Sequence, residues 1–153
     1  PYVGVIDAQS TLRKDTGYFV NTASGSNDSG YAVNMSGDIY HNNSNSYATN
    51  IGSISTGDIL GFAIDLDSAQ RTCEIYKNGT SQRSFNLDEP TSGAYMLACC
   101  SVYNTASASA NFGNGYFGTT AVSSAGTNAS GIGIFEYDVP TGYTALSTKG
   151  LNL

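Results

Sequence analysis

The sequence predicts a single all-β domain, an antiparallel β-sandwich. Short runs of alternating apolar and polar residues recur at a spacing of roughly 8–12 residues, separated by clusters of Gly, Asn, Ser and Asp. No segment shows sustained helical periodicity. The length of 153 residues, with 40% hydrophobic residues, 11 Tyr and 6 Phe, is enough for one hydrophobic core. We therefore expect residues 1–153 to form one domain.

Ten runs are expected to form strands. In chain order they cover residues 2–6, 31–35, 38–41, 58–66, 71–77, 81–87, 95–103, 106–112, 134–137 and 143–146. The dipeptide Asn78-Gly79 is the strongest turn signal, because both residues tolerate the positive φ of a type I′ hairpin turn. Ser36-Gly37 predicts a second tight turn.

Side-chain alternation predicts which residues face the core. In the run 71–77, Cys73 and Ile75 are expected to point inward, and the run 95–103 is apolar enough to predict a central strand. The segments 21–30, 42–50 and 118–133 are rich in Gly, Ser, Asn and Thr, so we expect loops there.

The charge balance excludes several classes of partner. The formal net charge is −6 and the chain has only six Lys and Arg, so no basic patch is expected to bind nucleic acid or an anionic membrane. No apolar stretch reaches the length of about 18 residues that predicts a membrane span, and we expect no membrane insertion.

The three cysteines are interpreted as small apolar residues, because Cys73, Cys99 and Cys100 lack a metal-binding spacing.

Two carboxylate pairs are the first candidates for catalysis. Asp65 with Asp67, and Glu136 with Asp138, are each separated by one residue within a single predicted strand. Glycosidase pairs flank the scissile bond and normally come from different elements. Turn capping or solvation is the favoured interpretation of all four side chains.

Other catalytic and metal sites find little support. His41, the only histidine, is accompanied by no Gly-x-Ser-x-Gly motif, and we interpret it as an exposed or partly packed hairpin residue. A calcium site at Asp65, Asp67 or the loop around Asp28 is a less favoured alternative, because no EF-hand spacing is present. We expect no enzymatic activity, no catalytic residue, no metal and no cofactor.

Five segments carry a family resemblance. The segments 57–67 (GDILGFAIDLD) and 72–79 (TCEIYKNG) resemble the middle of a SPRY domain. Three further segments resemble family motifs in the same order: 39–42 (IYHN), 111–113 (NFG) and 140–146 (PTGYTAL). The resemblance implies a SPRY or concanavalin A-like jelly roll. The family's early aromatic-rich strands and all Trp are absent, so we expect the N-terminal strands to be missing and the chain to be a fragment of a longer protein.

The resemblance also implies a function. The polar composition, rich in Gly, Ser, Asn and Thr, and the PTGYTAL ending resemble those of SPRY-like modules in phage tail fibres, spikes and capsid decorations. We expect a structural or adhesion domain of a virion, made in the bacterial host cytoplasm, that contacts other virion proteins, identical subunits, or a glycan or protein of the host surface. The alternatives are a cellular SPRY-type peptide- or protein-recognition module and a lectin-like carbohydrate-binding domain.

Any recognition surface is expected on loops, because a rigid sandwich presents its functional residues there. The residue types that suit such a surface are Tyr and Asn, which combine broad contact with adaptable hydrogen bonding. The candidates are Tyr40, Asn42, Asn43, Asn45, Tyr47, Tyr103 and Asn104. Tyr40 matches the family's pocket aromatic in its motif. The alternative is that all seven are solvated loop residues.

Overall fold

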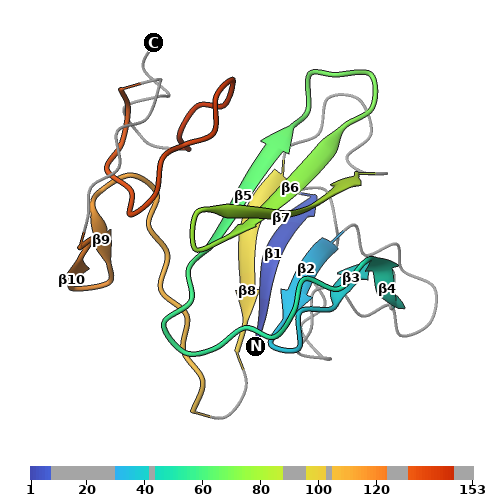
Figure 1. Ribbon diagram of the computed structural model, residues 1–153, viewed down its shortest axis with the longest axis horizontal. Helices are drawn as coiled ribbons and strands as arrows, with labels where there is room; N and C mark the ends of the chain where they lie inside the picture. The colour runs from blue at the N-terminus through green and yellow to red at the C-terminus, as the bar shows by residue number, and fades with distance from the viewer. Residues whose placement is uncertain (8–29, 42–43, 88–95, 103–104, 124–130, 147–153) are drawn as a thin grey trace.

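The computed structural model describes residues 1–7, 30–41, 44–87, 96–102, 105–123 and 131–146. Ten strands and no helix lie in these ranges (Figure 1). They are β1 (Tyr2–Asp7), β2 (Gly30–Asn34), β3 (Ile39–His41), β4 (Ser44–Ala48), β5 (Leu60–Asp65), β6 (Thr72–Lys77), β7 (Thr80–Asn86), β8 (Met96–Ser101), β9 (Tyr116–Phe117) and β10 (Thr120–Ala121). No helix in the described ranges could cross a membrane.

The strands form two main antiparallel sheets. The larger sheet has the order β4-β3-β2-β1-β8 and the smaller sheet has the order β5-β6-β7. The two layers face each other in Figure 1, and β9 and β10 form a separate small hairpin. The predicted all-β sandwich is therefore confirmed.

Two turns fix the local register as the sequence predicts. Asn78 and Gly79 have φ values of 50° and 77°, which is the backbone that a type I′ turn between β6 and β7 requires. Asn78 also accepts a hydrogen bond from the Ile59 backbone N–H at 2.9 Å and donates one to Asp58 Oδ1 at 2.7 Å. Gly37, at φ 84°, makes the turn between β2 and β3.

The core lies between the two sheets. Its buried members come from both layers: Val5, Tyr31, Val33, Ile39, Ile51, Cys73, Ile75, Phe85 and Leu87. The alternating side chains of β5, which include Leu60, Phe62 and Ile64, are partly buried against this cluster. Cys73 and Ile75 face inward as predicted.

An aromatic cluster closes the sandwich beneath β2, β3 and β4. The rings of Tyr31 and His41 stack in parallel with centroids 4.0 Å apart. Tyr47 packs against both, and Phe85 of the opposite sheet lies 5.8 Å from Tyr31 and 5.9 Å from Tyr47. His41 is only 3% exposed and its Nδ1 lies 3.1 Å from the Gly30 carbonyl oxygen. The interpretation of His41 as an exposed or partly packed residue is therefore corrected to a buried one.

Several predicted elements differ in the structure. The run 95–103 forms β8 at an edge of the larger sheet, where β1 is its one described neighbour, so its apolar character does not reflect a central position. The predicted loop 42–50 contains β4, and the predicted loop 118–133 contains β10. Residues 106–112, 134–137 and 143–146 belong to no described strand, although Ile134 makes an isolated bridge to Asn114. In 106–112, the Ser and Ala side chains are too small to bury much apolar area against a neighbouring sheet.

Candidate binding cleft between the two sheets

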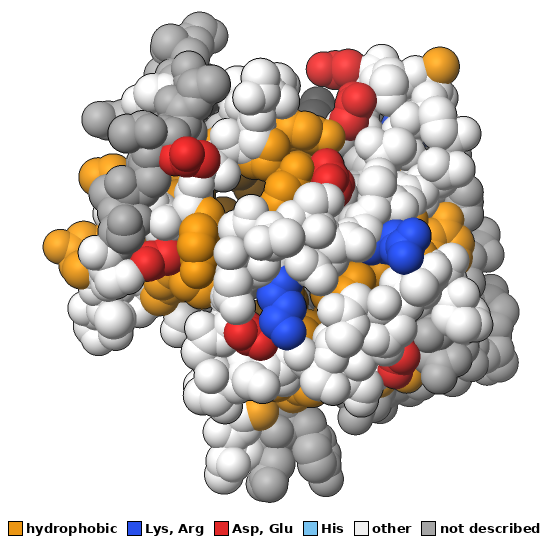
Figure 2. Space-filling view, viewed as in Figure 1, with side chains coloured by type: hydrophobic (Ala, Val, Ile, Leu, Met, Phe, Trp, Pro, Cys, Tyr) orange, Lys and Arg blue, Asp and Glu red, His pale blue; other side chains and the backbone are white. Residues whose placement is uncertain are grey.

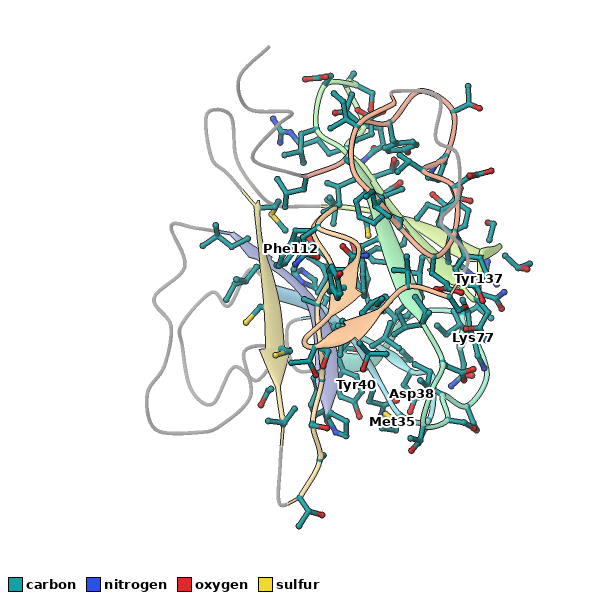
Figure 3. All side chains as sticks on the ribbon, turned by 90° about the vertical axis from the view of Figure 1, so that its left-hand side faces the viewer. Met35, Asp38, Tyr40, Lys77, Phe112 and Tyr137 are labelled. Carbon is teal, nitrogen blue, oxygen red and sulfur yellow. The ribbon has the colours of Figure 1, made fainter. Side chains whose placement is uncertain are left out.

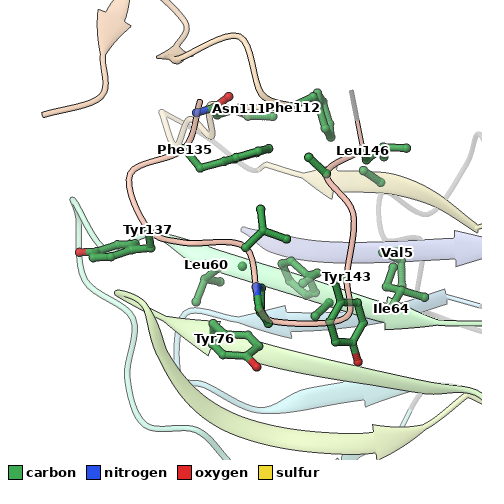
Figure 4. Close-up of a pocket in the computed structure, with 18 of the residues that line it drawn as sticks. Val5, Leu60, Ile64, Tyr76, Asn111, Phe112, Phe135, Tyr137, Tyr143 and Leu146 are labelled. Carbon is green, nitrogen blue, oxygen red and sulfur yellow. The ribbon is translucent and has the colours of Figure 1, made fainter. Parts of the chain in front are cut away.

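A cleft of about 1400 Å³ opens between the sheets on the side away from the aromatic cluster. Strands β1 and β8 line it on the larger sheet, and β5 lines it on the smaller sheet. Residues 108–112, 135–140 and 142–146 add to its walls, together with Tyr76, Gly79 and Phe117. Figure 2 shows orange side chains gathered in a hollow of the surface, and Figure 4 shows the lining residues in close-up.

The lining is mainly apolar and rich in aromatic rings. The aromatic residues are Phe62, Tyr76, Phe112, Phe117, Phe135, Tyr137 and Tyr143. Phe112 is 49% exposed and Tyr137 is 40% exposed, and the two rings lie well apart on this face of the molecule (Figure 3). Monomeric proteins rarely leave large contiguous apolar surfaces uncovered unless those surfaces bind something. The cleft is therefore the leading candidate for a binding site.

Asn111 and the glycines beside it hold the C-terminal wall in place. Asn111 Nδ2 donates a hydrogen bond to the Ile134 carbonyl oxygen at 2.9 Å, and its Oδ1 accepts one from Gly113 N–H at 2.7 Å. Ile134 N–H donates in turn to the Gly113 carbonyl oxygen at 3.0 Å. This short ladder places the following residues, including Phe135 and Tyr137, along the cleft (Figure 4).

The charge of the cleft is negative. Of the 12 Asp and Glu residues in the chain, Asp65, Asp67, Glu136 and Asp138 line it. The basic residues that the structure describes, Arg71, Lys77 and Arg83, do not line it. Figure 2 shows red carboxylates close to the orange hollow. The cleft therefore favours a ligand that is neutral or positively charged.

Two of these carboxylates are held by hydrogen bonds. Asp65 Oδ1 accepts from the backbone N–H groups of Asp67 at 2.9 Å and Ser68 at 3.1 Å, as the sequence predicted for the turn after β5. These bonds, from Ser68 first and then Asp67, lower the pKa of Asp65, so its carboxylate stays ionised at neutral pH. Glu136 accepts hydrogen bonds from the backbone N–H of Ser123, at 2.6 Å, and from the Ser123 hydroxyl.

The phenols of Tyr76 and Tyr143 stay neutral in this setting. Burial is the first cause that raises the pKa of each, and the carboxylate of Glu74 adds to it for both residues. Figure 4 shows the two rings near each other at the β5–β6 side of the cleft. Neutral phenols offer apolar ring faces together with hydroxyl groups that can donate hydrogen bonds.

Two of the binding residues predicted from the sequence, Tyr40 and Tyr47, do not line this cleft. Tyr40 lies on the outer face of the larger sheet, where its ring meets Tyr2 edge-on at 5.1 Å. Tyr47 lies on the opposite face, within the aromatic cluster, and its hydroxyl donates to the Asn86 carbonyl oxygen at 2.9 Å. The structure therefore does not bring Tyr40 and Tyr47 together.

The structure places only one of the other five predicted binding residues. Asn45 belongs to β4, whereas Asn42, Asn43, Tyr103 and Asn104 lie outside the described residues. The reasoning from sequence missed the cleft because it looked for binding residues only in polar loops. The closely spaced aromatic residues Phe135, Tyr137 and Tyr143, in a segment that also carries Glu136 and Asp138, were the signal that could have indicated it.

No protein-family model, curated protein or solved structure matches this chain. Within the described residues, no group of three or more His, Cys, Asp or Glu side chains is placed to hold a metal ion.

Proposed function

We propose that this chain is a non-enzymatic recognition domain of a phage virion, which binds its partner in the cleft between β5 and β8. The observation that carries the proposal is the aromatic, acidic lining of that cleft. The partner is another virion protein or a molecule of the host surface, and the domain belongs to a tail fibre, a spike or a capsid decoration.

The SPRY-like segments support the family part of this proposal. The residues that resemble the family's central motif form β5, β6 and the turn at Asn78-Gly79. Asp65, in the D-L-D end of the motif, caps the turn after β5 through its two backbone hydrogen bonds. A SPRY-type jelly roll with missing N-terminal strands is part of the proposal, and so is the position of the domain in a virion.

Two features of the described residues favour binding over catalysis. A general acid needs a pKa raised toward the working pH, whereas hydrogen bonds lower the pKa of Asp65. His41 lies opposite Tyr31 in the ladder of β2 and β3, and its ring stacks on Tyr31 within the aromatic cluster, away from the cleft. A buried, stacked imidazole is poorly placed to activate a nucleophile at a substrate.

A carbohydrate ligand is the second candidate for the cleft. Exposed Phe and Tyr rings can stack on the apolar face of a sugar, and carboxylates can accept hydrogen bonds from its hydroxyl groups. Phe112 and Tyr137 supply such exposed rings, and Asp67 and Asp138 supply exposed carboxylates. A cellular peptide-recognition role would use the same cleft in a different biological setting.

Electron microscopy of particles labelled with an antibody tests the virion assignment. An antibody raised against the purified chain is expected to mark symmetric positions on the tail or capsid of the particle encoded with it. Labelling confined to host-cell material, with no particle labelled, would contradict the assignment. An unrelated antibody of the same class serves as the control.

A further inference from the structure

The outer face of the smaller sheet carries an aromatic and acidic group of side chains beside β5. Ile75 of β6 points into the core, and successive side chains of a strand point to opposite faces, so Glu74 and Tyr76 lie on the outer face. Across the ladder with β5, Ala63 lies opposite Glu74 and Gly61 lies opposite Tyr76. Gly61 has no side chain and Ala63 has only a methyl group, so neither fills the space beside the Tyr76 ring.

The cleft extends around the edge of β5 onto this outer face. Residues from both faces of β5 line it, namely Leu60, Phe62 and Ile64 from the inner face and Gly61, Ala63 and Asp65 from the outer face. Tyr76 lines it from β6, and Tyr143 lines it from the segment 135–146. The rings of Tyr76 and Tyr143 lie near each other (Figure 4). The outer part of the cleft is named the tyrosine pocket below, and it is lined by Gly61, Ala63, Asp65, Tyr76 and Tyr143.

Two carboxylates give the tyrosine pocket a negative charge. Asp65 lines it, and Glu74 lies next to Tyr76 on the same face of β6, where it accepts a hydrogen bond from the Tyr76 hydroxyl. Burial, followed by the charges of Asp65 and Glu74, raises the pKa of Tyr143, so both carboxylates act on this ring. No basic residue that the structure describes lines the cleft. The tyrosine pocket is therefore complementary to a cation.

Hydrogen bonds within the protein already engage both carboxylates. Asp65 accepts from two backbone N–H groups of the turn after β5. Glu74 accepts from the hydroxyl groups of Ser81 and Tyr76. These bonds leave fewer acceptor sites for a ligand, whereas the negative charge of each carboxylate remains. A cation without N–H donors fits such a site best, because it leaves no donor unsatisfied when it loses its contact with water.

We infer that the tyrosine pocket binds a quaternary ammonium group, such as that of choline, against the rings of Tyr76 and Tyr143. The inference rests on the proposed function, since it names the chemical group that the recognition cleft accepts. The faces of neutral phenol rings attract a quaternary ammonium ion through their negative potential. Asp65 and Glu74 supply the opposite charge.

Isothermal titration calorimetry of the full chain with choline chloride tests the inference. We expect saturable binding, with a titration of sodium chloride as the reference for ionic strength. The uncharged analogue in which carbon replaces the choline nitrogen has the same shape, and it should bind about 10-fold more weakly because the rings and carboxylates no longer attract it. Ethanolamine, a primary ammonium ion, should also bind more weakly than choline. Equal binding of the uncharged analogue, or equal or tighter binding of ethanolamine, would overturn the inference.

Two variants of Tyr143 separate the role of its ring from that of its hydroxyl group. Tyr143→Leu removes the aromatic face and should weaken choline binding about 3- to 30-fold. Tyr143→Phe keeps the ring and should change the affinity less than about threefold. A thermal melt of each variant checks that it is folded. Unchanged choline binding by folded Tyr143→Leu would overturn the inference.

The variant Asp65→Asn tests the role of charge without depending on Tyr143. Its amide oxygen can still accept the hydrogen bonds of the turn, and the loss of charge should weaken choline binding about 3- to 10-fold. Asp38→Asn is the matched control, because Asp38 also accepts side-chain hydrogen bonds, from Asn34 and Asn50, but does not line the cleft. Equal weakening by the two variants would overturn the inference.

A phosphate beside the ammonium group should reduce the affinity. Asp67 and Asp138 also line the cleft, so phosphocholine is expected to bind more weakly than choline. Tighter binding of phosphocholine would overturn the inference, since it would show that the cleft attracts an anion. None of these titrations bears on whether an antibody against the chain labels virions. The failure of this inference and the failure of the virion assignment are therefore distinguishable.

Discussion

The two sides of the inter-sheet space differ sharply. Beneath β2, β3 and β4, four rings from both sheets fill the space, and Tyr31 in their centre is 1% exposed. Beneath β1 and β8, irregular segments lie beside β5 of the smaller sheet, and a cleft of about 1400 Å³ separates them from the larger sheet. The comparison separates the residues that stabilise this sandwich from those available to a ligand.

Truncating a ring on the closed side should have the largest effect on stability. Tyr31→Ala removes a fully buried side chain between two sheets and is expected to lower the free energy of unfolding by about 3–5 kcal/mol. Tyr137→Ala, on the open side, removes a ring that is 40% exposed and should cost less than about 1 kcal/mol. Urea denaturation of both variants provides the measurement. Similar losses in the two variants would contradict the distinction between the sides.

The Cys73 thiol should make stability fall at alkaline pH. Burial raises its pKa to about 12, whereas the thiol in the unfolded chain has a pKa of about 8.5. The unfolded chain therefore loses this proton first, so the contribution is intact below about pH 8.5 and decreases as the pH rises toward 12. At pH 10 the expected loss is about 2 kcal/mol.

The variant Cys73→Ala isolates this effect from other titrating groups. Urea melts of both proteins at pH 7.5 and pH 10 should show a smaller decrease for the variant, whatever its stability at pH 7.5. An equal decrease in the two proteins would show that the thiol does not titrate as its burial implies.

The hydroxyl of Tyr47 should make a smaller contribution. Tyr47→Phe keeps the ring in the aromatic cluster but removes the hydrogen bond to the Asn86 carbonyl oxygen, which links β4 to the smaller sheet. We expect a loss of about 0.5–1.5 kcal/mol in the free energy of unfolding. Tyr40→Phe, which changes the same residue type on the outer face, is the matched control. If only the control were destabilised, the assignment of Tyr47 to the closed side would be wrong.

Local patterns in the sequence were enough to predict the strands that form hairpins. The alternation in β5 and β6 and the turn at Asn78-Gly79 determine face, register and backbone conformation within a short stretch of chain. The order of strands in the larger sheet was not accessible in this way. The pairing of β1 with β8 joins residues between 89 (Asp7 with Met96) and 99 (Tyr2 with Ser101) positions apart. An apolar run also looks alike at the centre of a sheet and beside a cleft.

The candidate site was harder to predict for the same reason. Strands β1, β5 and β8 and the segment 135–146 are distant in sequence and meet only in the folded protein. Tyr47 illustrates the converse error, since a tyrosine among Asn and Ser resembles a loop residue but packs into the core. The acidic residues were recognised individually, whereas their position around one cleft depends on the tertiary structure.

The rate of thiol labelling tests the contrast between the two sides most directly. Cys100 is exposed and lines the cleft, whereas Cys73 is 0% exposed on the closed inner surface. Single-cysteine variants, C73A/C99A and C99A/C100A, should be labelled with a maleimide under native conditions. Cys100 is expected to react at close to the rate of a free thiol, and Cys73 only as fast as the protein unfolds. Equal protection of both thiols would mean that the cleft is not open to solvent and would contradict this account.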